Sequence, residues 1–135
     1  MPRALIAVLV FAVACGSESS SEPAVNRVGD WSGTTSQDKA MSFGVTSSGV
    51  DAPTFTYVLQ GTKCGYTSTI SIPTPDGLHV TSNHFSMDKT QLGQALFVYA
   101  TGDFTGAADA TGTFTVQDGQ CGDTLNLTWT AKKGS

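Results

Sequence analysis

Three cysteines give this chain most of its capacity for covalent chemistry, and they lie at Cys15, Cys64 and Cys121. A cysteine can carry a lipid, ligate a metal or pair with a second cysteine in a disulfide. In an exported protein, an odd number of cysteines leaves one thiol over after pairing, and that thiol requires its own explanation. If Cys15 carries a lipid, the other two remain as one pair, and we expect a disulfide between Cys64 and Cys121.

The titratable side chains favour structural roles over catalytic ones. Beyond the two glutamates near the N-terminus, all nine acidic residues are aspartates. A short carboxylate beside a glycine can hydrogen-bond its own backbone and stabilise a turn. Five aspartates have such a position: Asp30, Asp76, Asp103, Asp118 and Asp123. The loop from Asp118 to Asp123 offers oxygen ligands for calcium but departs from the EF-hand pattern. We expect His79 and His84, whose odd spacing sends them to opposite faces of a strand, at the surface.

The sequence also lacks the motifs of the common enzyme classes. It has no cysteine spacing typical of redox or zinc sites, no nucleophile elbow and no glycine-rich phosphate loop. Charged residues make up 13% of the chain and the net charge is −4, so no basic surface is available for a phosphate backbone. We therefore expect a protein that is not an enzyme, with no catalytic residues, no metal, no cofactor and no nucleic-acid partner.

The start of the chain is typical of an export signal. Arg3 supplies a positive charge, and Ala4 to Val13 is an apolar run too short to span a bilayer as a helix. Residues 12–16, Ala-Val-Ala-Cys-Gly, resemble the lipobox of bacterial lipoproteins, which implies a lipid on Cys15. Ala12-Val13-Ala14 also fits an ordinary cleavage site, which would release a periplasmic or secreted protein.

A polar spacer follows the cysteine. Residues 16–23, with the sequence GSESSSEP, lack apolar side chains and cannot pack, which favours a flexible tether. We expect a signal peptide over residues 1–14, a lipidated Cys15 with its tether over 15–26, and one domain over 27–135. The predicted location is the bacterial cell envelope, with the membrane as partner through the lipid.

The domain has the two-residue period of β-strands. Nineteen threonines, fourteen serines and fifteen glycines suit pleated strands and tight turns. Strands are predicted over 31–35, 41–46, 54–60, 67–72, 78–81, 85–88, 96–105, 110–116 and 125–131, with the last closing the sheet. Asp118-Gly119 predicts a tight hairpin. The expected fold is an all-β, antiparallel small barrel or two-sheet sandwich of eight or nine strands with one disulfide.

Alternation also predicts which side chains face the interior. Apolar residues on one face of the predicted strands form this set: Met41, Phe43, Val45, Phe55, Tyr57, Leu59, Phe114, Val116, Leu127 and Trp129.

Two resemblances concern the domain as a whole. The segments 29–35 (GDWSGTT), 64–65, 102–104, 112–114, 121–122 and 129–132 (WTAK) resemble a group of small bacterial exported β-domains and lipoproteins with no assigned activity. The Gly29-Asp30-Trp31 signature is also similar to that of lipocalin and avidin barrels. That likeness implies a tryptophan packed near a basic residue of the last strand, here Lys132 or Lys133, and a pocket for an apolar ligand.

These observations lead to one expected function and two alternatives. We expect a membrane-anchored envelope lipoprotein whose non-catalytic domain binds a protein or glycan partner or covers the surface. The first alternative is a barrel carrier of a small apolar ligand, and the second is a hydrolase.

Overall fold

The computed structural model describes residues 26–134, and all regular secondary structure in that range is β-strand. The strands are β1 (Gly29–Thr35), β2 (Ala40–Thr46), β3 (Gly49–Gln60), β4 (Gly65–Ser71), β5 (His84–Ser86), β6 (Thr90–Gly93), β7 (Leu96–Phe104), β8 (Asp109–Asp118) and β9 (Asp123–Lys133). The all-β fold class is therefore confirmed. Within residues 26–134 there is no helix long and apolar enough to cross a membrane. The predicted signal peptide and Cys15 lie outside the described residues.

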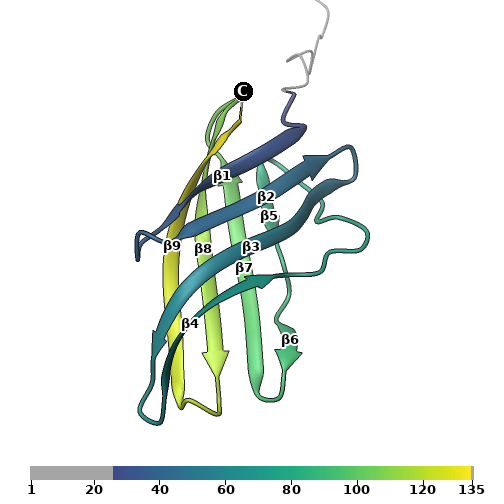
Figure 1. Ribbon diagram of the computed structural model, residues 1–135. Coiled ribbons are helices and arrows are strands. Elements are labelled where there is room, and N and C mark those ends of the chain that lie inside the picture. Colours follow the sequence, from purple (N-terminus) through teal and green to yellow (C-terminus); the bar gives the residue numbers. More distant parts are fainter. Residues whose placement is uncertain (1–25, 135) are drawn as a thin grey trace, which may run out of the picture.

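One continuous antiparallel sheet coils into two facing layers. Its order is β4-β3-β2-β1-β9-β8-β7-β5, and β6 also pairs with β7. In Figure 1, β1 to β4 cross in front of β9, β8 and β7. The prediction that the last strand closes the sheet is wrong, because β9 lies in the middle, between β1 and β8. The sheet stays open between β4 and the edge formed by β5 and β6.

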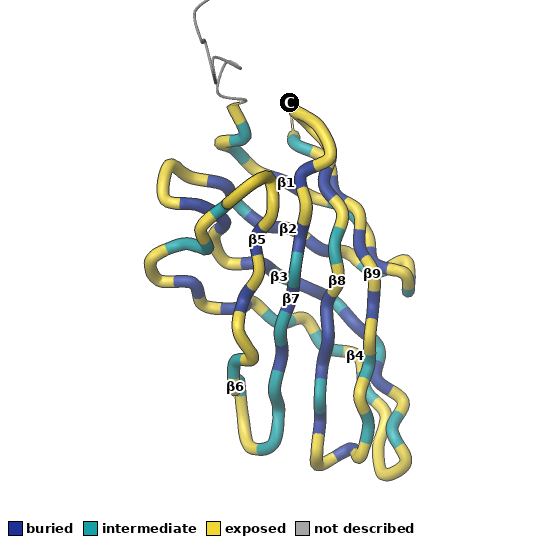
Figure 2. The backbone as a smooth tube through the Cα atoms, turned by 180° about the vertical axis from the view of Figure 1, so that it is seen from behind, coloured by how far each residue is buried: buried dark blue, intermediate teal, exposed yellow. Residues whose placement is uncertain are grey.

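The predicted interior is confirmed, since all ten residues expected to face inward are buried. Figure 2 shows buried positions alternating with more exposed ones along β7 and β9, whereas β8 has a run of three buried residues from Phe114 to Val116. Side chains of the two layers meet directly: the Phe55 and Phe114 rings stack with centroids 4.0 Å apart. Nearer the chain ends, Trp31 lies 5.7 Å from Phe43 and 5.1 Å from Phe104, measured between ring centroids. Aromatic rings thus fill the space between the layers.

Two glycines make room for the largest of these rings. Gly102 of β7 is the register partner of Gly112 of β8, which in turn lies opposite Trp129 of β9. A Cβ atom on Gly102 would lie 2.8 Å from the Trp129 ring and would also overlap the ring of Phe85. The absence of a side chain at the two glycines therefore leaves space for the Trp129 indole and, at Gly102, for the Phe85 ring.

The connection between β4 and β5 differs from the sequence prediction. Residues 78–81 form only isolated bridges, Val50 to Leu78 and Thr81 to His84, and the short strand β6 was not predicted. The hairpin expected at Asp118-Gly119 has four residues between the paired Asp118 and Asp123, and its positive φ of 70° falls on Gly122. The Asp118 carboxylate accepts the amides of Gln120 and Cys121, and the Asp118 carbonyl accepts the amide of Gly122, which together fix this longer turn.

Candidate functional site

The predicted disulfide between Cys64 and Cys121 is formed, with the two Cα atoms 5.0 Å apart. Cys64 ends the turn after β3, and Cys121 lies in the turn between β8 and β9. The backbone of the two turns is also joined, because the Lys63 amide donates to the Cys121 carbonyl at 3.2 Å. The bond therefore ties the β3–β4 hairpin to the facing layer of the sheet.

Next to the disulfide, Asp118 accepts hydrogen bonds from three donors. One carboxylate oxygen accepts the Tyr66 hydroxyl at 2.7 Å, and the other accepts the backbone amides of Gln120 and Cys121, each at 2.9 Å. Because the single Tyr66 hydrogen is given to Asp118, the Tyr57 hydroxyl at 3.3 Å must donate to Tyr66. Asp118 is thus a turn former as predicted, and it also connects the two layers.

These contacts shift the pKa of both residues in opposite directions. The pKa of Asp118 lies below its ordinary value of 3.8, chiefly because Tyr66 donates to the carboxylate and also because the Cys121 amide does. The pKa of Tyr66 is raised, first by burial and then by its hydrogen bonds to Tyr57 and Asp118. Tyr66 therefore stays a neutral donor while Asp118 stays charged.

We expect Asp118→Asn to lower the free energy of unfolding at pH 7 by about 1.5–3 kcal/mol, the usual contribution of hydrogen bonds to a charged group. Since the folded-state pKa of Asp118 is depressed, its contribution exists above the ordinary carboxyl pKa and is lost as pH falls through the folded value. Urea denaturation at pH 7 and below pH 4 should show a steeper loss of stability on acidification for the parent than for the variant.

Asp123→Asn is the matched control, because that carboxylate lies in the same turn and accepts only the amide of its neighbour Thr124. An equal effect of both substitutions at pH 7 would contradict the special role of Asp118.

The other candidate residues lie apart from this cluster. Asp30 and Asp103, predicted in turns, lie within β1 and β7, because the adjoining glycines belong to strands. His84 of β5 lies opposite Asp103, with 2.7 Å between His84 Nδ1 and the carboxylate, and both side chains are exposed. His79 is exposed in the β4–β5 connection. Among the described residues, no three His, Cys, Asp or Glu side chains lie close enough together to hold a metal ion.

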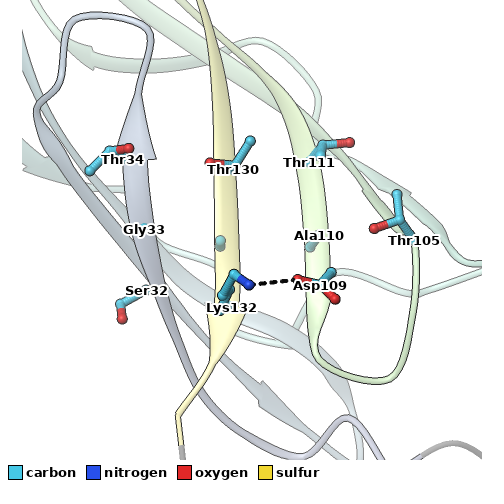
Figure 3. A pocket seen from close by; sticks show the side chains of 10 residues that line it. Ser32, Gly33, Thr34, Thr105, Asp109, Ala110, Thr111, Thr130 and Lys132 are labelled. Atoms are coloured by element: carbon cyan, nitrogen blue, oxygen red, sulfur yellow. Dashed lines mark ion pairs between the residues drawn. The ribbon is translucent and has the colours of Figure 1, made fainter.

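A hollow of about 550 Å³ lies on the outer face, where β1, β9 and β8 run side by side (Figure 3). Exposed hydroxyls and one ion pair line it, over a floor of small residues: Ser32, Gly33, Thr34, Thr105, Asp109, Ala110, Thr111, Thr130, Ala131 and Lys132. Gly33 permits the close approach of β1 to β9, because a Cβ atom there would overlap the Thr130 carbonyl. The volume is within the range of small-molecule sites.

The polar groups of this hollow are hydroxyls and one ion pair. Asp109 and Lys132 lie 3.5 Å apart with both side chains exposed, and such surface pairs contribute about 0–1 kcal/mol. Asp109 is the only carboxylate among the lining residues described, whereas glycoside hydrolysis uses two. Hydroxyls that donate and accept hydrogen bonds fit a neutral polar partner.

The end of the sheet near Trp31 also has a basic residue. The indole Nε1 of Trp31 donates to the Arg27 carbonyl at 2.9 Å, and the Arg27 guanidinium lies 4.7 Å from the centre of the Phe104 ring. Lys133, the register partner of Trp31, donates to the Asn26 carbonyl at 2.9 Å. Lys133 of the last strand therefore lies beside Trp31 in the sheet, and Arg27, which precedes the first strand, stacks on the Phe104 ring.

Sequence reasoning missed Tyr66 and the hollow. The alternation along β4 places Tyr66 on the inner face. Its partner Asp118 is 52 residues away in sequence, so the contact between them has no local signal. The outward threonines of β8 and β9 are visible as a pattern, but the hollow depends on β1 lying beside β9. Comparison of the chain with protein families, characterised proteins and solved structures finds no match.

Proposed function

We propose that this chain is a lipid-anchored protein of the bacterial cell envelope, whose non-catalytic β-domain binds a partner or covers the surface. The pairing of Cys64 with Cys121 carries the proposal, because it accounts for both cysteines of the domain. Cys15, directly after a short apolar run and before a polar spacer, is the cysteine that this pairing leaves for a lipid. Disulfides persist in oxidising compartments, which supports export.

The outer face supports the binding or covering role of the domain. Across β8, β9 and β1 it exposes hydroxyl side chains, and the charges in the hollow neutralise each other. Such a face resists non-specific ionic contacts and offers hydrogen bonds to a protein or a glycan.

Interior packing argues against the alternative of an apolar carrier. A carrier needs a cavity between the layers, yet Phe114 stacks on Phe55 and lies 6.0 Å from Tyr57, measured between ring centroids. Phe43 and Trp129 meet across the layers at 5.7 Å. A ligand could enter only by displacing side chains that are already close-packed.

Fatty-acid incorporation tests the anchor in growing bacteria. When the full chain is expressed with a labelled fatty acid, we expect label on the parent protein and none on Cys15→Ser. Cys64→Ala/Cys121→Ala should keep the label, which makes it the matched control for loss of cysteine. An unlabelled parent, or a labelled Cys15→Ser chain, would show that the proposed anchor is wrong.

A further inference from the structure

We propose that β4 is a self-pairing edge through which two copies of this chain form an antiparallel dimer. The two open edges of the sheet differ in how well they are protected against pairing with another strand. Natural proteins shield sheet edges with short strands, charged residues, prolines or bulges, because an unshielded edge pairs with other chains.

The edge made by β5 and β6 has this protection. β5 has three residues and β6 has four, and a shift of register interrupts the pairing of β6 with β7 between Gln91 and Gly93. Asp88 and Lys89 lie between the two short strands. This edge is therefore too short and too irregular to template another strand.

The edge made by β4 has none of these features. β4 has seven residues, pairs with β3 in unbroken register, and contains no charged residue and no proline. Within residues 26–134, β3 is the only strand that pairs with it. A comparable stretch of exposed backbone is capped elsewhere: the Gln37 side chain bonds both the amide and the carbonyl of Val58, where β3 extends beyond β2.

The phase of the ladder shows which backbone groups of β4 face outward. The Ile72 amide donates to the Pro53 carbonyl, and the Gly61 amide donates to the Cys64 carbonyl, each at 2.8 Å. Hydrogen bonding in an antiparallel ladder alternates from residue to residue, so the even-numbered residues of β4 bond to β3. The odd-numbered residues present their N–H and C=O groups at the free edge: Gly65, Thr67, Thr69 and Ser71.

A second copy fits this edge in one favourable register. With a two-fold axis at Ser68, Thr67 pairs with the partner's Thr69 and Gly65 with the partner's Ser71, so every free backbone group of β4 is bonded. On the inner face, Tyr66 then lies opposite the partner's Ile70, an aromatic and β-branched pair that stabilises sheets. A register centred on Thr69 is worse, because it places Gly65 opposite Pro73, which has no N–H.

Two further features favour a second copy as the occupant. β4 carries no charge, so two copies meet without repulsion although the chain has a net charge of −4. Tyr66 and Ile70 are only partly buried in one chain, and the partner strand would cover them. The contact is isologous, as closed two-fold dimers require. It does not depend on the lipid anchor.

Sedimentation equilibrium of the full chain in detergent solution tests the dimer. We expect a protein mass twice that of one chain, falling to one chain for Thr69→Pro. Proline removes the outward N–H but is tolerated at an edge where that N–H faces solvent. Thr69→Val keeps the N–H and is the matched control, which should remain dimeric. Near-ultraviolet circular dichroism shows that each variant is folded.

Thr69→Lys tests the same edge without a backbone change. In the proposed register the two introduced lysines are diagonal neighbours about 7–8 Å apart, so this variant should dimerise more weakly than the parent chain. A parent chain that is monomeric at every concentration overturns the proposal and leaves the edge for a strand of a different protein. A dimer of Thr69→Pro as stable as that of the parent chain overturns it as well.

Discussion

Removal of the Cys64–Cys121 disulfide is expected to lower the free energy of unfolding by about 4 kcal/mol, from the entropy of a loop of this length. The two cysteines are 57 residues apart in sequence, so the bond strongly restricts the unfolded chain. It also joins the β3–β4 hairpin to the turn between β8 and β9, which belong to opposite layers. Without it, β4 is held in the sheet by β3 and by the contact of Tyr66 with Asp118.

Urea denaturation of Cys64→Ala/Cys121→Ala, followed by tryptophan fluorescence, measures this loss. Reduction of the parent should reproduce it, because both treatments remove the same constraint. Cys15→Ala is the matched control and should leave the unfolding free energy unchanged, since Cys15 lies outside the described domain. A loss below about 1 kcal/mol in the double variant would contradict the stabilising role assigned to the bond.

Replacement of Trp129 by alanine is expected to lower the free energy of unfolding by about 3–5 kcal/mol. The indole is buried, and its ring lies 5.7 Å from Phe43 and 6.2 Å from Phe85 between centroids. Gly102→Ala should lower the free energy of unfolding by about 1–3 kcal/mol because it overpacks the core. Its methyl group would be forced against the Phe85 and Trp129 rings.

The two substitutions together should cost clearly less than the sum of their separate effects. The space left by Trp129 accommodates part of the methyl group, so the residues are coupled. Denaturation of the two single variants and the double variant forms the cycle that measures this coupling. Strictly additive losses would contradict a packing contact between residue 102 and the Trp129 indole.

The parts of the fold that depend on local alternation could be predicted from the sequence. The inward positions of Phe43, Phe55 and Trp129 follow from a two-residue period, and all three are buried. The pairing of Cys64 with Cys121 followed from counting cysteines. Both inferences need only the order of residues and the rule that successive strand residues face opposite sides.

The remaining features depend on contacts between distant segments. Asp103 adjoins a glycine and so favours a turn, but pairing of β7 with β8 keeps both residues within a strand. The segment from Leu78 to Thr81 has β-forming residues, yet it forms only two isolated bridges, to Val50 and to His84. The open edge at β4 could not be predicted, because sheet order is decided by which strands meet in space.

Intact-mass analysis of protein from the native membrane fraction tests whether Cys15 carries a lipid anchor. We expect a chain that begins at Cys15, carries a diacyl or triacyl adduct and lacks the two hydrogens lost in the Cys64–Cys121 bond. A soluble chain with an unmodified Cys15 would contradict it and would favour ordinary cleavage after Ala14.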